Sequence, residues 1–194
     1  MEARRRFKPL WRWEALLFAV VLVAAMAASL VARPSLPVVG PIASVLLLAI
    51  AVAAALALIV PLLRKKGHDS ENSRHDLGGV ELVPFPGLGE VPVTTRVVES
   101  ERRQTAIEAA LAKSRAVQAV LTPDASRWLG RELRVAVDLV DDAGAAHRVG
   151  FVPRDVDARV DEALRTVTAD SGRAATVPVT VVGAERPRRV EIVL

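Results

Sequence analysis

The chain has 194 residues, a net charge of +4 and no cysteine. The absence of cysteine excludes disulfides, thiol catalysis and cysteine-based zinc sites. The charge is divided unevenly, because residues 1–75 carry 10 cationic and 4 acidic side chains (+6) while residues 76–194 carry 16 and 18 (−2). The basic character therefore belongs to the N-terminal part, and the rest of the chain has no overall electrostatic attraction for nucleic acid.

Two apolar segments predict a helical hairpin across a membrane, residues 14–33 and 41–63, joined by a short external turn at 34–40. As a helix, the first segment covers roughly 27 Å, close to the thickness of a hydrocarbon core. Neither segment carries a charged residue in its interior, which favours an anchor over a transporter. Small residues at helical spacing, such as Ala24 and Ala28 or Ala49, Ala53 and Ala57, suit close helix packing or a homo-oligomer.

Basic residues on both sides of the hairpin predict its direction. They precede the first span in a basic N-terminus (1–13) and follow the second, so both termini are expected in the cytoplasm. The excess of arginine over lysine, 22 to 4, is typical of a high-GC bacterial genome, and the plasma (inner) membrane is the expected location. The alternative, a cleaved signal peptide, would leave the C-terminal part on the same side. The predicted membrane-interface residues are Arg4, Arg5, Arg6, Trp11, Trp13, Arg64, Lys65 and Lys66.

Residues 64–90 are polar and rich in glycine and proline, which predicts a juxtamembrane linker. Residues 91–194 then alternate strand and helix patterns. Strands are expected at 91–99, 116–123, 133–140, 146–152, 176–183 and 188–194, and helices at about 101–112 and 153–167. The expected fold is a small cytosolic α+β domain with a strongly bent antiparallel sheet.

The stretch AAHRVGFVPRDVDARV, residues 145–160, predicts a strand that runs into a helix. Pro153 suits the first helical turn, and Gly150 suits a close approach or a bulge beside Phe151. The helix is expected to bury one apolar stripe, formed by Val156, Val160, Leu164 and Val167.

The order of these elements resembles the HIRAN domain over about residues 93–168. The resemblance rests on VVESERRQTAIEAAL, with Val98-Glu99-Ser100 as the turn and Gln104, Ala106 and Ile107 in the helix, and on Gly150, Phe151, Val152 and Arg154 after the hairpin. The family implies single-stranded DNA binding at 3′ ends. The family's loop before the first hairpin strand is replaced here by PDASRWLGRE, and the stacking tyrosines are absent. The candidate ligand-binding residues are Arg103, Trp128, Phe151 and Arg154, with Arg102, Arg127 and Arg131 as further phosphate contacts.

The resulting hypothesis is a membrane-anchored cytosolic module that binds a ligand or a protein without catalysis; the alternative is a membrane-tethered single-stranded-DNA-binding domain. No nucleophile motif, phosphate loop or metal-ligand spacing is recognised, so no enzyme activity, metal or cofactor is expected. The expected partners are the lipid bilayer and a protein or a second copy, with nucleic acid as the alternative. Six acidic or histidine side chains could in principle serve in catalysis, but positions in a turn, at a helix start or on the solvent-facing surface of a strand explain them equally well. They are Asp138, Asp141, Asp142, His147, Asp155 and Asp157.

Overall fold

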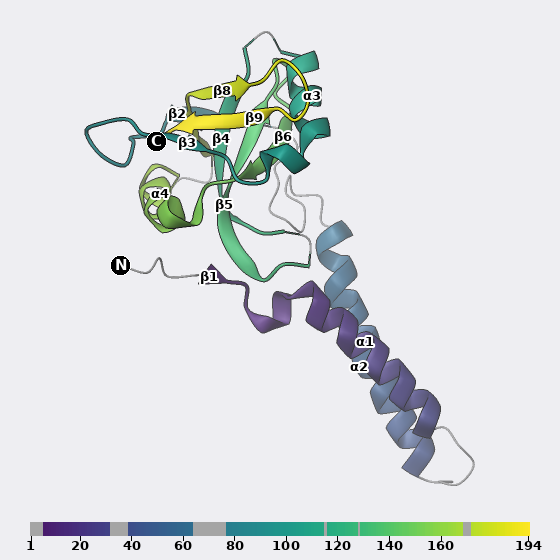
Figure 1. Cartoon of the computed structure of the whole chain (residues 1–194). Coiled ribbons are helices and arrows are strands. Elements are labelled where there is room, and N and C mark those ends of the chain that lie inside the picture. The colour runs from purple at the N-terminus through teal and green to yellow at the C-terminus, as the bar shows by residue number, and fades with distance from the viewer. Residues whose placement is uncertain (1–5, 32–38, 64–76, 115, 128, 169–171) are drawn as a thin grey trace. The chain divides into compact units, whose positions relative to one another are not determined.

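The computed structural model describes residues 6–31, 39–63, 77–114, 116–127, 129–168 and 172–194 (Figure 1). The chain divides into two compact units. The α+β unit comprises Met1–Arg6, Gly67–Ser126 and Glu132–Leu194, and the helical unit comprises Phe7–Lys66 and Arg127–Arg131. A loop from the middle of the chain, Arg127–Arg131, therefore groups with the apolar helices.

The helical unit contains α1 (Glu14–Val31) and α2 (Val39–Leu63), preceded by a short 3-10 helix, η1 (Leu10–Arg12). Both α-helices are long and apolar enough to cross a membrane, which agrees with the two predicted segments. The predicted external turn (34–40) falls largely outside the described residues.

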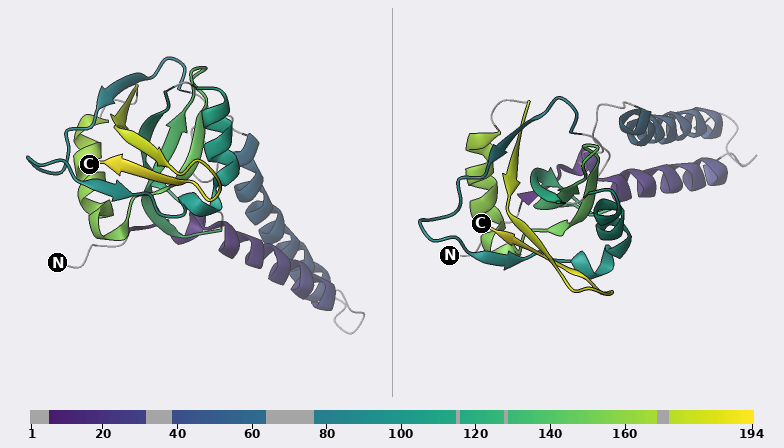
Figure 2. Two further views of the ribbon diagram at one scale, coloured as in Figure 1. Left: turned by 45° about the horizontal axis from the view of Figure 1, so that its top comes forward. Right: turned by 90° about the horizontal axis from the view of Figure 1, so that it is seen from above.

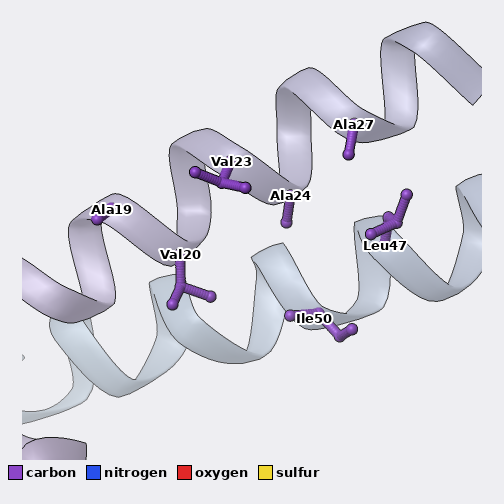
Figure 3. Close-up of a pocket in the computed structure, with 7 residues that line it drawn as sticks. All are labelled: Ala19, Val20, Val23, Ala24, Ala27, Leu47 and Ile50. Atoms are coloured by element: carbon purple, nitrogen blue, oxygen red, sulfur yellow. The ribbon is translucent and has the colours of Figure 1, made fainter.

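Small residues let α1 and α2 pack closely. The buried alanines are Ala24, Ala51 and Ala54, whereas the predicted set Ala49, Ala53 and Ala57 is exposed. A shallow hollow between the helices is lined by aliphatic side chains alone: Ala19, Val20, Val23, Ala24, Ala27, Leu47 and Ile50 (Figure 3). The lining of this hollow has no polar side chain, and elsewhere between the two helices Ser44 Oγ donates to the Ala28 carbonyl at 3.4 Å.

The larger sheet of the α+β unit has the strand order β1-β5-β4-β7-β2, with β6 also paired to β5. Its strands are β1 (Arg6–Phe7), β2 (Glu81–Pro84), β4 (Gln118–Ala125), β5 (Glu132–Val140), β6 (Ala146–Phe151) and β7 (Arg173–Val177). The sheet is mixed, because β2 runs parallel to β7 while the pairs β4–β5, β5–β6 and β4–β7 are antiparallel.

A second, three-stranded antiparallel sheet has the order β3-β9-β8. Its strands are β3 (Thr94–Arg96), β8 (Val179–Val182) and β9 (Arg189–Val193). Only Pro178 separates β7 from β8. Proline cannot donate a ladder hydrogen bond, so the chain leaves one sheet and enters the other at this residue.

Two helices pack on this unit, α3 (Gln104–Ala112) after the 3-10 helix η2 (Ser100–Arg102), and α4 (Arg154–Val167). They lie at opposite sides of the unit (Figure 2). Ile107 of α3 and Val160 and Leu164 of α4 are fully buried in one core with strand residues of both sheets. Pro153 occupies the N-cap of α4 and the predicted apolar stripe faces the core, so the prediction for residues 153–167 is confirmed.

Gly150 creates both the close approach and the bulge that the sequence predicts. The register of β5 and β6 shifts between Val137 and Asp138, opposite Gly150 and Arg148. A Cβ at Gly150 would lie 2.2 Å from the Val98 carbonyl oxygen and 2.6 Å from Val97 Cγ1. This space lets Phe151 and Val98 exchange backbone hydrogen bonds of 2.9 and 3.1 Å.

Two expectations are wrong. Residues 77–90 are not linker, because Leu77 is buried and β2 joins the edge of the larger sheet. The sheet is not purely antiparallel, since that same strand pairs in parallel with β7. In addition, the strand predicted at 91–99 is confined to Thr94–Arg96, because the chain turns into η2 within the next few residues.

The Gly150→Ala variant should lose about 1–3 kcal/mol of unfolding free energy, because the added methyl group overlaps a backbone oxygen that cannot rotate away. Gly89→Ala is the matched control, since no atom lies within 4 Å of the position that a Cβ would take there. Both full chains would be unfolded by denaturant in detergent and followed by protease susceptibility of the α+β unit. Equal midpoints for the two variants would contradict the packing argument.

Candidate functional site

A cluster of ion pairs in the α+β unit is built around Arg6. Its guanidinium Nη1 lies 2.9 Å from Asp124 Oδ1 and 2.6 Å from Asp161 Oδ2, and its Nη2 lies 3.6 Å from Asp157 Oδ2. The side chains of Asp157 and Asp161 are 12% and 7% exposed, so the contact is largely removed from water. Charge-assisted bonds of this kind are stronger than neutral ones when solvent is excluded.

Local structure explains how the carboxylates converge. Asp157, Asp161 and Arg165 follow one another at a spacing of four residues along α4, and this spacing aligns them on one helix face. Arg165 Nε donates to Asp161 Oδ2 (2.8 Å), and its Nη2 reaches both oxygens of Asp124 (3.0 Å). Asp124 is held in the left-handed region (φ 53°) near the end of β4, where the register with β5 shifts.

Asp157 also makes a hydrogen bond outside the ion pairs: its Oδ1 accepts the backbone N–H of Val135 at 2.8 Å. Val135 lies within β5 and is fully buried, so no water can replace this acceptor. Burial raises the pKa of Asp157, and the Val135 hydrogen bond and the charges of Arg134 and Arg6 act in the opposite direction. The helix α4 is thereby fixed to the centre of the sheet by a polar contact as well as by its apolar stripe.

We name Arg6, Asp124, Asp157, Asp161 and Arg165 the Arg6 cluster. The three carboxylates form ion pairs with the two guanidinium groups. This arrangement suits a structural role, in which the cluster fixes the segment that carries Arg6 to β4 and α4. Sequence reasoning identifies Asp157 as a candidate acid and assigns Arg6 to the membrane interface, but it misses Asp124, Asp161 and Arg165. The spacing Asp157-Asp161-Arg165 is a usable signal for the helix face, whereas nothing in the sequence links residue 6 to residues 124 and 161.

The residues predicted to bind a ligand are not gathered into one open site. Phe151 is fully buried, and the guanidinium groups of Arg103 and Arg134 lie over its ring at 5.8 and 5.2 Å from the centroid. Its face is therefore covered by protein cations, and the predicted stacking on a base is wrong for this residue. Arg154 is exposed and pairs with Glu132 at 2.6 Å. Trp128 lies outside the described residues.

The acidic residues considered for catalysis have separate structural partners. Asp138 is buried and binds Arg148 Nε (3.0 Å) and the Thr122 hydroxyl (2.7 Å). Asp142 accepts a hydrogen bond from Ser114 at 2.6 Å, and Asp155 is exposed in the first turn of α4.

Asp141 shapes the turn between β5 and β6. Its Oδ1 accepts the backbone N–H groups of Ala143 (3.0 Å) and Ala145 (2.9 Å), and its Oδ2 lies 3.1 Å from His147 Nε2. The hydrogen bond with His147 lowers the pKa of Asp141, and the two backbone bonds add to this effect. His147 is only 18% exposed, so the expected solvent-facing histidine is in fact turned toward the carboxylate.

Two predicted membrane-interface residues are described with their side chains. Arg6 contacts carboxylates and is only 23% exposed, so the prediction that it faces lipid headgroups is wrong. Trp13 precedes α1, and its indole Nε1 donates to the Leu129 carbonyl at 3.0 Å. The backbone of Trp11 lies in η1. The other predicted interface residues, Arg4, Arg5, Arg64, Lys65 and Lys66, lie outside the described residues.

Within the described ranges, no group of three or more His, Cys, Asp or Glu is placed to hold a metal ion. Comparisons with protein families, with curated proteins and with solved structures find no match to this chain.

Asp157→Ala should cost about 1–3 kcal/mol of unfolding free energy, because it leaves the buried Val135 N–H without its acceptor. Asp157→Asn keeps an oxygen for that bond and should cost less. The exposed neighbour Asp155→Ala serves as the control and should stay within about 0.5 kcal/mol of the parent. Denaturant unfolding of the full chains in detergent measures the three values, and an Asp157→Ala cost no larger than that of Asp155→Ala would refute this role.

Acid should weaken the β5–β6 turn through Asp141. Its folded pKa lies below the ordinary value of about 3.9, so its contribution to stability is present above that pH and is lost as the pH falls below it. Asp141→Asn retains an acceptor for Ala143 and Ala145 but has no charge to lose. The stability difference between parent and variant should therefore shrink as the pH is lowered from 6 toward 3, measured by denaturant unfolding. A difference that is constant with pH would contradict the assignment.

Proposed function

We propose that this chain is a two-span membrane anchor that holds an α+β binding module on the cytoplasmic face, and that the module binds a protein partner without catalysing a reaction. The apolar helices α1 and α2 supply the anchor. The observation that carries the proposal is the position of Arg6 within the carboxylates of the α+β unit.

Arg6 precedes the first helix, whereas Asp124, Asp157 and Asp161 follow the second. A contact between them requires both segments to lie on one side of the membrane, which is the geometry of a helical hairpin. The basic residues on both sides of that hairpin support the cytoplasmic side. The contact also supports retention of the N-terminal segment over its removal as a signal peptide.

Binding of a protein is supported by the smaller sheet. In the described part of the chain, β8 pairs with β9 alone, so its outer edge carries unpaired backbone donors and acceptors. Thr180 and Val182 on this edge strand are exposed. Exposed edges of this kind accept an extended segment of a partner as an additional strand.

Single cysteines test the proposed topology directly, because the chain has no cysteine of its own. Ser35→Cys in the predicted external turn and Ala143→Cys in the exposed β5–β6 turn would be treated with an impermeant maleimide in spheroplasts and in inverted membrane vesicles. We expect Ser35→Cys to react only in spheroplasts and Ala143→Cys only in inverted vesicles. Reaction of both positions from the same side would contradict the hairpin.

The partner is tested with a photo-crosslinker on Thr180→Cys in membranes. Glu162→Cys, exposed on α4, is the matched control for non-specific neighbours. We expect a discrete crosslinked protein with Thr180→Cys and none with Glu162→Cys. The same pattern for both positions, or no product at Thr180, would count against the edge strand as the binding surface.

The HIRAN-like assignment remains a proposal based on sequence motifs alone. The burial of Phe151 and the ion pair of Arg154 with Glu132 give single-stranded DNA less support than a protein partner.

A further inference from the structure

The loop between β4 and β5, Arg127–Arg131, is bound to the segment that leads into α1. Lys8 N donates to the Arg131 carbonyl (2.7 Å), and Arg131 Nε donates to the Lys8 carbonyl (3.0 Å). The indole of Trp13 donates to the Leu129 carbonyl at 3.0 Å. The Arg131 guanidinium also lies over the rings of Phe7 (5.6 Å) and Trp13 (6.0 Å).

These contacts place the loop at a defined position along the helical unit. Trp13 is the residue immediately before α1, whose first residue is Glu14. A group hydrogen-bonded to Trp13 lies at the end of the apolar helix, where the headgroups begin if α1 spans the bilayer. This step rests on the proposed anchor.

Large apolar side chains are exposed in this region, next to exposed cationic ones. Phe7, Leu10 and Leu129 are 51%, 53% and 41% exposed. Leu129 is also held at a positive φ of 58°, a region that leucine rarely adopts. The exposed part of this side chain is apolar, and an acyl layer beside it would bury that part.

The charge of the same two segments favours one kind of lipid. Residues 7–13 and 127–131 contain four cationic residues, Lys8, Arg12, Arg127 and Arg131, and no acidic one. Lys8 also pairs with Glu14 at 2.8 Å. Amphipathic and cationic side chains together at an interface are typical of contact with anionic headgroups.

We infer that residues 127 and 129–131 of the β4–β5 loop, together with the segment Phe7–Trp13, form a surface that binds the headgroups of anionic lipids and inserts Leu129 at their level. This surface is distinct from the edge strand β8, to which the protein partner is assigned.

The test uses the full cysteine-free chain in nanodiscs of phosphatidylcholine with increasing phosphatidylglycerol. An environment-sensitive fluorophore is attached at Leu129→Cys, with lipids that carry a quencher near the headgroup or deep in the acyl chain. Leu10→Cys gives the reference for headgroup depth, Ala143→Cys the reference for the aqueous turn, and Val45→Cys on α2 the reference for the spanning helix. We expect the label at 129 to be quenched like the label at 10 and unlike the label at 143.

The outcomes separate the two proposals. If the label at 45 is not quenched by deep quenchers, the spanning anchor fails and this inference with it. If the label at 45 is quenched but the label at 129 behaves like that at 143, the lipid-binding inference alone is overturned. A label at 129 that protein shields from all quenchers gives the same result and overturns it as well.

Arg131→Gln in the Leu129→Cys background tests the lipid charge. Removal of one cation near an anionic surface should raise the phosphatidylglycerol fraction needed for half of the fluorescence change about fivefold. Arg188→Gln, in the α+β unit, is the control and should leave that fraction unchanged. Quenching at 129 that is independent of phosphatidylglycerol in the parent would overturn the anionic preference.

Discussion

A guanidinium group that is largely removed from water must be matched by carboxylates, and Arg6 is matched by Asp124, Asp157 and Asp161. This contact determines much of what surrounds it. It requires α4 to present two aspartates one turn apart toward the sheet, and it requires a left-handed conformation at Asp124, near the end of β4, that aims this carboxylate at the same point. Asp157 then joins the cluster to the backbone of β5, so the ion pairs are continuous with the hydrogen bonding of the core.

The division of the chain follows from a different set of contacts. Arg131, Lys8 and Trp13 are linked by backbone and indole hydrogen bonds, and these assign five residues of a strand connection to the helical unit. The chain therefore passes between the two units after β1 begins, at both ends of the β4–β5 loop and after α2.

Local patterns predict what depends on local physics. The β5–β6 hairpin, the start of α4 at Pro153 and the role of Gly150 follow from alternation, helical spacing and the absence of a side chain. Local patterns do not predict the strand β2, because it is short and lies among prolines and glycines. Its partner β7 is also far away in sequence. Local patterns do not predict the ion pairs of Arg6 either, because its partner Asp124 lies 118 residues later in the sequence. The β4–β5 loop does carry a signal: all three tryptophans of the chain lie in residues 11–13 and 128, beside arginines.

The separation between Arg6 and its carboxylates also imposes an order on biosynthesis. When Arg6 leaves the ribosome, neither Asp124 nor Asp161 has been translated, and both apolar helices emerge before either of them. A chain in which these helices enter the membrane as they are made has therefore completed its insertion before the Arg6 cluster can close. Until then, the carboxylates of α4 have no partner from the N-terminal segment. Non-local closure of this kind is slow in folding terms.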